Sequence, residues 1–535
     1  MLTNFINKHK IAALFLIVVL GFCLRVRGLG SVGFNEDEVQ KVIAARSYLH
    51  GGFSVNLEHP MLMKSLITIS LAATDLWNRK HGQSSQIPEE TSIRLPNVIF
   101  GSLTAVVIFL IGQELFGVGI GLLSALLWSA GTIAIMVNRV AKEDTLLVFF
   151  TWLAYFLYLR AKKLSSTDEN RASRFYGASG ASFGLMLASK YFPHYMGLNA
   201  LYYYLRGRRY PGRPLGKRAY LSLLGACAIA FILVNPIVLL PSSLRYMVHY
   251  VGGSSITHHG YLVMGHLYRE NVGGAGGMPV YFYLLMLAIK TPIPILAGLL
   301  AGLVGTWRNR REAGPSFLIF MFLFWIVPFS LIGSKWLRYM LAWMPAVYII
   351  AAIGLTRIWS WLAVMAQPRM HSRLAPVLAA AFVFLFVVYP VGVAAYSGPY
   401  YSLYLNAFGL GRTGYYFPHD EVNDMGLRPA IEHISQEAPN GASVGGEAGP
   451  VFSYYLHKFG RDDLRYFDLS DRAARVSAAD SAFLVLQDGR TYRENLAFVQ
   501  RIQSSERPIQ TVKIGGADAA RIYYTEEVAE LRSGR

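Results

Sequence analysis

The sequence predicts an α-helical integral membrane protein with about eleven transmembrane helices, followed by a small soluble α/β domain. Of its 535 residues, 53% are hydrophobic and only 15% are charged, whereas soluble proteins carry about 25% charged residues. Long apolar runs recur over most of the chain, and charges become frequent only near its end. The formal charge of +18 resides mainly in short loops between these runs, which argues against nucleic-acid binding.

Each predicted membrane helix is an apolar run near the length of about 20 residues that a bilayer-spanning helix needs. The first run follows a short basic start, but no small-residue cleavage pattern comes after it, so we interpret it as a retained span rather than a signal peptide. Cys23 and Cys227 both lie within apolar runs, which excludes a disulfide framework. The predicted spans lie at 11–29, 97–115, 118–137, 145–160, 175–189, 191–205, 219–240, 279–305, 316–333, 339–363 and 375–396.

Loops rich in Lys and Arg predict the orientation, because such loops stay on the cytoplasmic side. Four loops of the chain are rich in Lys and Arg. When the spans are counted from a cytoplasmic N-terminus, all four loops lie on the cytoplasmic side, although Arg25 and Arg27 favour the opposite orientation for the first span. We therefore expect a multi-pass protein of the plasma (inner) membrane. The four loops lie at 160–174, 206–218, 307–311 and 367–373.

Two domains follow from this topology. Residues 1–396 form the membrane domain, with a first outer loop at 30–96, and residues 397–535 form a domain on the outer face. In the second domain, β-like runs at 481–487 and 520–525 alternate with a helical pattern at 493–503.

Ionisable residues at the edges of the spans gather on the predicted outer face. Charged groups at such positions are costly and often mark a functional cavity, although a single one is usually an interfacial charge that reaches the headgroups. Here many such residues lie on the same predicted face, which favours a functional site over isolated interfacial charges. The set comprises Asp37, Glu38, Glu58, His59, Lys64, Arg139, Asp144, Lys190, Lys290 and Arg338.

The mixture of acids and bases indicates a chemistry. Lys and Arg beside a membrane suit a phosphate or pyrophosphate, and a neighbouring carboxylate suits a general base that takes a proton from an attacking hydroxyl. Together they describe the transfer of a group from a lipid-linked phosphate to an acceptor.

The first outer loop resembles that of the dolichyl-phosphate-mannose protein mannosyltransferases and the lipid A aminoarabinose transferases, which are polyprenyl-phosphate-dependent glycosyltransferases of the GT-C type. Asp37-Glu38 is followed by "AARSYLHGGF" and by "HPMLMK" at 59–64, where Met61 replaces the second Pro of the family pattern. Glu58-His59 occupies the place of an acid and a base in the aminoarabinose branch.

Further motifs in the same order are similar to those of the family. The resemblance covers about residues 10 to 430, and the tail beyond about 435 carries no family signal of its own. The motifs are "RLPNVIFGSL" (94–103), "NRVAKEDTLLVFF" (138–150), "GLMLASKY" (184–191), the segment 258–294 with "KTPIP", "LRYMLAWMPAVYIIAAIGL" (337–355) and "YSLYLNAFGLG" (401–411).

The resemblance implies an inverting glycosyltransferase that moves a hexosyl or pentosyl group on the outer face. By it, the catalytic residues are Asp37, as the base, and its neighbour Glu38, with Glu36 a solvated neighbour. Arg139, Lys190 and Arg338, with His59 as a further donor, would stabilise the departing lipid phosphate. Glu58 or Asp144 would position hydroxyl groups or hold the basic residues. The partners implied are a polyprenyl-phosphate-linked sugar, the lipid bilayer and an acceptor protein, lipid or glycan.

The resemblance implies no required cofactor, although a divalent cation at the acid cluster stays open. A histidine group, His249, His258, His259 and His266, has no spacing typical of a tetrahedral metal site. Two rival functions are weighed. A transporter or flippase for a lipid-linked or anionic substrate would place charges near the bilayer midplane and show repeated halves, neither of which the sequence favours. A ligase that joins whole oligosaccharides from a lipid pyrophosphate would share the same basic residues.

Overall fold

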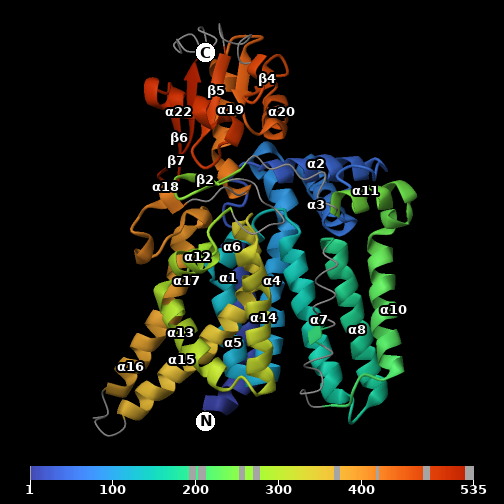
Figure 1. Cartoon of the computed structure of the whole chain (residues 1–535). Coiled ribbons are helices and arrows are strands. Elements are labelled where there is room, and N and C mark those ends of the chain that lie inside the picture. Colours follow the sequence, from blue (N-terminus) through green and yellow to red (C-terminus); the bar gives the residue numbers. More distant parts are fainter. Residues whose placement is uncertain are drawn as a thin grey trace.

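The computed structural model describes residues 2–191, 201–202, 212–251, 260–268, 277–366, 374–416, 421–473 and 482–524. A bundle of long helices carries a smaller domain with a β-sheet at one end, and the N-terminus lies at the other end (Figure 1). We call the end of the bundle below this domain the domain side.

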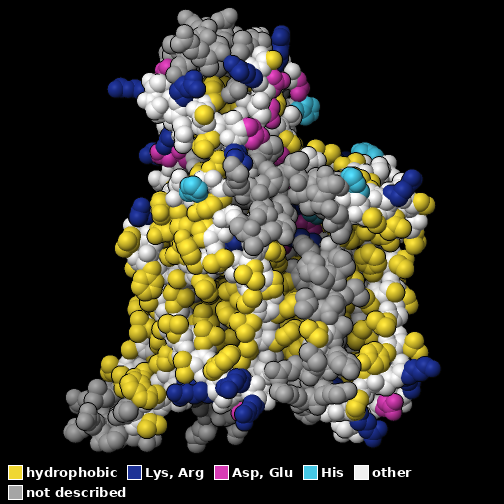
Figure 2. Space-filling model, in the orientation of Figure 1, with side chains coloured by type: hydrophobic (Ala, Val, Ile, Leu, Met, Phe, Trp, Pro, Cys, Tyr) yellow, Lys and Arg dark blue, Asp and Glu magenta, His cyan; other side chains and the backbone are white. Residues whose placement is uncertain are grey.

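Seven helices of the described ranges are long and apolar enough to cross a membrane, and the number rises to eight if the bent pair α5 and α6 is counted as one span. A broad band of hydrophobic side chains covers the face of the bundle seen in Figure 2, and Lys and Arg side chains gather at its lower edge. The protein is a multi-pass membrane protein. The helices of the bundle are α1 (Leu2–Val26), α4 (Glu89–Phe116), α5 (Val118–Ser129), α6 (Thr132–Asn138), α7 (Asp144–Leu164), α8 (Glu169–Ser189), α10 (Lys217–Val234), α12 (Phe282–Lys290), α13 (Ile293–Arg308), α14 (Ala313–Leu331), α15 (Met344–Ala366), α16 (Leu374–Val383) and α17 (Tyr389–Ser397).

The helices differ from the predicted spans where proline or glycine interrupts an apolar run. The run at 279–305 is divided into α12 and α13 at Pro292, where proline, which has no amide hydrogen to donate, stands directly before the first residue of α13. The run at 118–137 bends by 58° between α5 and α6. The predicted span at 191–205 lies almost wholly outside the described residues.

Small residues allow several helices to approach closely, as is common in membranes. A Cβ atom on Gly180 of α8 would lie 2.0 Å from the Leu223 carbonyl of α10, and one on Gly302 of α13 would lie 1.9 Å from the Ile350 carbonyl of α15. These contacts fix α8 against α10 and α13 against α15.

Three helices lie across the domain side of the bundle rather than along it: α2 (Glu36–Leu49), α3 (Met61–Lys80) and α11 (Pro241–Val251) (Figure 1). The first two belong to the predicted outer loop 30–96. A short hairpin of β1 (Tyr261–Val263) and β2 (His266–Tyr268) lies on the same side.

The domain at the C-terminal end contains a five-stranded sheet in the order β4-β3-β5-β7-β6. β3, β4 and β5 are parallel, whereas β7 pairs antiparallel with both β5 and β6. The β-like runs and the helical pattern predicted in this region are confirmed by β5, β7 and α22. Its elements are β3 (Ser443–Gly446), β4 (Arg465–Asp468), β5 (Ala482–Gln487), β6 (Gln510–Ile514), β7 (Ala517–Tyr524), α19 (Leu427–Glu437), α20 (Gly449–Lys458) and α22 (Leu496–Ser505), with the single turn α18 (Thr413–Tyr416) before them.

Arg25, whose charge opposed the predicted orientation, is buried inside the bundle. Its guanidinium donates to the Asn138 side chain at 3.0 Å and to the carbonyls of Gly21 and Ser129 at 3.0 and 3.1 Å. A buried arginine that joins α1 to α5 and α6 is not a loop charge, so the positive-inside rule does not apply to it.

Candidate active site on the domain side

The first turn of α2 carries the three consecutive acids of the sequence. Asn35 caps this helix with a capping box in which its side chain accepts from the Glu38 amide at 3.0 Å. Because an α-helix has 3.6 residues per turn, three consecutive side chains point in different directions. Glu36, Asp37 and Glu38 therefore meet different partners.

Glu38 is a buried ion-pair partner. One of its oxygens accepts from Arg94 Nη2 at 2.6 Å, and the other accepts from Arg94 Nε and the Ala141 amide, both at 2.8 Å. Glu38 thus ties α2 to α4 and to the turn between α6 and α7. Both of its carboxylate oxygens are already occupied.

Glu36 differs from the prediction of a solvated neighbour. Its carboxylate accepts from Arg490 at 2.5 Å, and its amide donates to Asp424 at 3.2 Å. The Glu36 side chain is nevertheless 37% exposed, so it remains in contact with solvent, but the sequence does not show its contacts with the C-terminal domain.

Asp37 is partly exposed, as Glu36 is. The Asp37 side chain is 39% exposed and the Glu36 side chain 37%, and Asp37 forms an ion pair with Lys142, which is only 5% exposed. Burial by the surrounding protein disfavours the charged form, but Lys142, Lys41 and Arg338 outweigh this effect and hold the pKa of Asp37 well below its usual range. Asp37 is therefore ionised at neutral pH.

The turn that begins α7 supplies three consecutive charges, Lys142, Glu143 and Asp144. Lys142 pairs with Asp37 of α2. Glu143 is buried, 3.0 Å from Lys41 Nζ and 3.5 Å from His59 Nδ1. This turn therefore connects the first turns of α2 with the loop before α3.

Asp144 links the same turn to two later elements. Its Oδ1 accepts from Lys190 at the end of α8 at 2.9 Å, and its Oδ2 lies 3.7 Å from Arg338 Nε. Arg338 belongs to the 3₁₀ turn Leu337–Ala342 before α15. The ring of Tyr339 lies under both cations, 4.9 Å from Lys190 Nζ and 5.3 Å from Arg338 Cζ.

We call this set the charged cluster. It contains four cations and three carboxylates, so its net charge is +1 when all are ionised. Burial lowers the pKa of His59 to about 3, which keeps that imidazole neutral. An anion next to the cluster is therefore attracted to it. The members are Lys41, Lys142, Lys190, Arg338, Asp37, Glu143 and Asp144.

Besides Glu38, four predicted residues form hydrogen bonds with other segments of the protein: Arg139, Lys290, Lys64 and Glu58. Arg139 donates to the carbonyls of Arg25 and Gly28 at 2.6 and 2.9 Å, at the end of α1. The buried Lys290 donates to the Ser402 carbonyl at 2.6 Å.

Lys64 donates to the carbonyls of Asn56 and His59 at 2.5 and 2.9 Å, which orders the loop before α3. Glu58, in that loop, accepts from Asn56 and from the Tyr246 hydroxyl at 3.4 Å.

Three members of the charged cluster are not among the residues predicted from the sequence: Lys41, Lys142 and Glu143. Lys142 and Glu143 stand inside the "NRVAKED" turn, next to the predicted Asp144, so their charge was visible. Lys41 follows Asp37 by four residues, the spacing at which two helical side chains share a face. That spacing was the available signal for Lys41.

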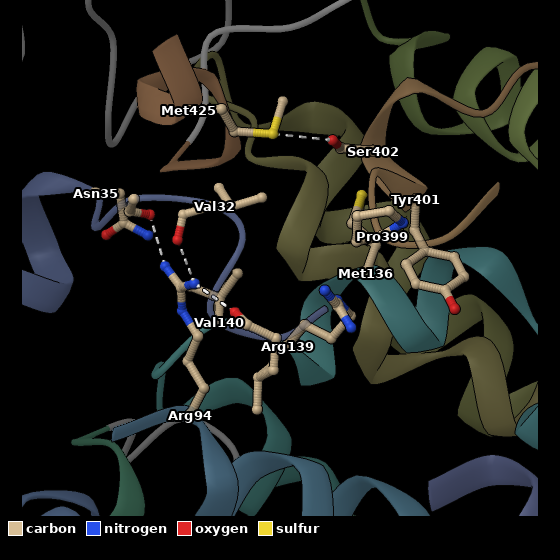
Figure 3. Close-up of a pocket in the computed structure, with 12 residues that line it drawn as sticks. Val32, Asn35, Arg94, Met136, Arg139, Val140, Pro399, Tyr401, Ser402 and Met425 are labelled. Atoms are coloured by element: carbon tan, nitrogen blue, oxygen red, sulfur yellow. Dashed lines mark hydrogen bonds between the residues drawn. The ribbon is translucent and has the colours of Figure 1, made fainter. Parts of the chain in front are cut away.

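A cavity lies between the loop before α2, the α6–α7 turn and the segment after α17 (Figure 3). Arg94 and Arg139 enter it from one side, and Tyr401 and Met425 line other parts of its wall. Its twelve lining residues include no member of the cluster.

The described ranges contain no group of three or more His, Cys, Asp and Glu side chains that could hold a metal ion. Of the histidine group, His258 and His259 lie outside the described residues, whereas His266 is in β2 and its ring contacts Tyr268.

The comparison of folds decides the class of the protein. ArnT from Cupriavidus metallidurans in the apo state aligns with a TM-score of 0.56 at 15% identity, covering 98% of this chain and 99% of that one. Its complex with undecaprenyl phosphate gives 0.52 at 15% identity, covering 99% of both chains. The protein has the GT-C fold. The predicted fold class is thereby confirmed.

Two further comparisons agree with a GT-C fold. The apo oligosaccharyltransferase of Archaeoglobus fulgidus aligns with a TM-score of 0.50 at 12% identity, over 89% of this chain and 69% of that one. The family model for dolichyl-phosphate-mannose-protein mannosyltransferase matches residues 86–239. This segment includes the α6–α7 turn and Lys190, whereas Asp37 and Arg338 lie outside it. A search of curated proteins found no match.

Proposed function

We propose that the protein is a membrane glycosyltransferase that moves a sugar from a polyprenyl-phosphate donor to an acceptor on the outer face, with inversion at the anomeric carbon. The observation that carries the proposal is the α6–α7 turn, which joins a half-exposed carboxylate, Asp37, to two cations, Lys190 and Arg338. The α6–α7 turn thus holds the proposed base, Asp37, and the two proposed phosphate-binding residues, Lys190 and Arg338, in fixed positions relative to one another. The GT-C fold supports the same reading, and ArnT, which shares it, has been crystallised with undecaprenyl phosphate.

Lys190 and Arg338 should interact more strongly with the departing lipid phosphate than with the intact donor. A polyprenyl-phosphate sugar is a phosphodiester with one negative charge, and the released lipid phosphate is a monoester that gains a second. Lys190 and Arg338 therefore interact more strongly as the bond between the anomeric carbon and the phosphate oxygen breaks. Interactions that strengthen toward the transition state are those that accelerate a reaction.

Asp37 acts on the acceptor. The acceptor oxygen attacks the anomeric carbon, its proton passes to Asp37, and the bonding electrons leave with the phosphate. Because its pKa is low, Asp37 is a weak base, so it takes the proton after the new bond has made the hydroxyl acidic. A single displacement of this kind inverts the configuration.

The other residues of the site support these two groups. We assign Glu38 to holding the first turn of α2, because Arg94 and the Ala141 amide occupy its oxygens. Lys41 and neutral His59 hold Glu143 and hence the α6–α7 turn.

Three predicted residues, Lys64, Arg139 and Lys290, keep backbone segments in place through their carbonyls. Glu58 keeps its predicted role toward acceptor or sugar hydroxyls. We propose that no metal takes part, because each carboxylate of the charged cluster already has a cationic partner.

The test is direct transfer in detergent. The purified protein is incubated with undecaprenyl phosphate carrying glucose, mannose, N-acetylglucosamine or 4-amino-4-deoxyarabinose, and with envelope membranes as the source of acceptor. We expect release of undecaprenyl phosphate with at least one donor and an anomeric configuration opposite to that of the donor in the product. Retained configuration would refute the single displacement, and no release with any donor would refute the proposed function.

Orientation is tested by labelling single cysteines. Ser84→Cys lies on the domain side and Arg310→Cys at the opposite end of the bundle, and both positions are exposed. We expect a membrane-impermeant reagent to label the first from outside intact cells and the second only after lysis. Labelling of both from outside would refute the orientation.

A further inference from the structure

The edge of the C-terminal sheet where ligands usually bind is occupied by the first turn of α2. In open α/β sheets, ligands bind beyond the carboxyl ends of parallel strands, at the point where the strand order reverses. Here β3 lies between β4 and β5, so the order reverses at β3. Gln487 ends β5, and Arg490 follows it three residues later; both donate to Asp424, and Arg490 also reaches Glu36.

Arg490 joins two carboxylates through one guanidinium. Its Nη1 lies 3.0 and 3.1 Å from the two oxygens of Asp424, and its Nη2 lies 2.5 Å from Glu36 Oε2 and 3.0 Å from the Tyr492 hydroxyl. Asp424 is 1% exposed and also accepts from the Glu36 amide at 3.2 Å. Glu36 is therefore held through both its side chain and its backbone. The planar fork of arginine makes such double contacts directional.

The turn that carries Asp37 is consequently fixed from two domains. Glu38 anchors it to α4 of the membrane domain through Arg94, and Glu36 anchors it to the C-terminal domain through Arg490. Asp37 lies between these two anchors. Without Arg490, Glu36 keeps only its amide bond to Asp424, so the side of the turn that faces the C-terminal domain is held less firmly, and the direction of the Asp37 carboxylate relative to Lys142 is less well fixed.

We propose that Arg490 is a positioning residue of the glycosyl transfer and that the C-terminal domain completes the active site by fixing the direction of Asp37. This inference rests on the proposed role of Asp37 as the base. It gives the soluble domain a part in catalysis that is separate from any recognition of the acceptor.

The kinetic test uses Arg490→Met in the full chain. A displacement of about 1 Å in a catalytic group costs about 100-fold in rate, so we expect kcat to fall by about 10- to 100-fold. The KM for the donor should change less than about threefold, because Lys190 and Arg338 lie on other elements and stay in place. Glu36→Gln should lower kcat in the wild type and add little further loss to Arg490→Met, since both remove the same anchor.

The matched control is Arg461→Met. Arg461 is also a paired arginine of the C-terminal domain, with Asp463 at 2.8 Å and the Ser435 carbonyl at 2.6 Å. These contacts hold the end of α19 and do not involve α2. We expect wild-type kcat and KM for this variant, so a loss equal to that of Arg490→Met would mean that domain stability alone matters and would overturn the inference.

Hydrogen exchange gives a readout that does not need activity. The Glu36 amide is bonded to Asp424, so Arg490→Met should raise exchange over residues 34–41, and Arg461→Met should not. Unchanged exchange together with wild-type kcat in Arg490→Met would overturn the inference. If the wild type transfers no sugar from any donor, the proposed function fails by itself, and unchanged exchange in the first turn of α2 would then refute the anchoring role of Arg490 as well.

Discussion

Replacing Asp37 by Asn tests the proposed chemistry most directly. The substitution keeps the size of the side chain and removes its negative charge, so the turn of α2 can keep its Glu36 and Glu38 anchors. A positioned general base contributes about 10²- to 10⁴-fold to a rate, which corresponds to about 3–5 kcal/mol in the activation free energy. We expect Asp37→Asn to lower kcat within that range.

Asp37→Asn should also affect the KM for the donor. Without the Asp37 carboxylate, the net charge of the cluster rises from +1 to +2, and Lys142 is released from its ion pair. A phosphate donor is then attracted at least as strongly as before, so its KM should stay the same or fall. Initial rates of undecaprenyl-phosphate release over a range of donor concentrations separate the two parameters.

Asp75→Asn is the matched control. Asp75 is an acid of α3 on the same side of the protein, 31% exposed and paired with Arg46, but it does not contact the charged cluster. Exposed ion pairs of this kind contribute about 0–1 kcal/mol to stability, so near-wild-type kinetics are expected. Transfer by Asp37→Asn within about threefold of the control would refute the role of Asp37 as a base.

Three further outcomes are expected. Lys190→Ala and Arg338→Ala should each weaken undecaprenyl-phosphate binding by about tenfold or more, because a hydrogen bond to a charged group contributes about 1.5–3 kcal/mol; equilibrium binding equal to that of the wild type would contradict this. Treatment with EDTA should leave transfer unchanged, and a loss restored by Mg²⁺ would show that a metal takes part. Burial raises the pKa of Glu447 to about 7, so the folded domain retains a proton that the unfolded chain releases, and its stability should fall as pH rises from about 4.5 to about 7. Glu447→Gln should remove this pH dependence in limited proteolysis of the C-terminal domain, and an unchanged dependence would contradict the assignment.

The membrane class and much of the topology are readable from the sequence because the bilayer acts on local composition. Each spanning helix must satisfy its backbone internally and present apolar side chains, and both requirements are met within about 20 residues. Arg25 shows the limit of this local reading, since its burial against Asn138 depends on a helix more than a hundred positions away. The turn "NRVAKED" was recognised as part of a site because the predicted topology placed Arg139 and Asp144 on the same face as the other charges and because the turn resembles a motif of the family.

The roles of the acids Glu36, Asp37 and Glu38 were decided by the tertiary structure. In sequence they are equivalent neighbours, yet one pairs with Arg490, one with Lys142 and one with Arg94, on three different elements. A helix turns each side chain by about 100° from the last, so adjacent residues reach separate surroundings. Sequence therefore determined that charge is concentrated at this turn, and only the packing of distant segments around α2 determined which cation each carboxylate meets.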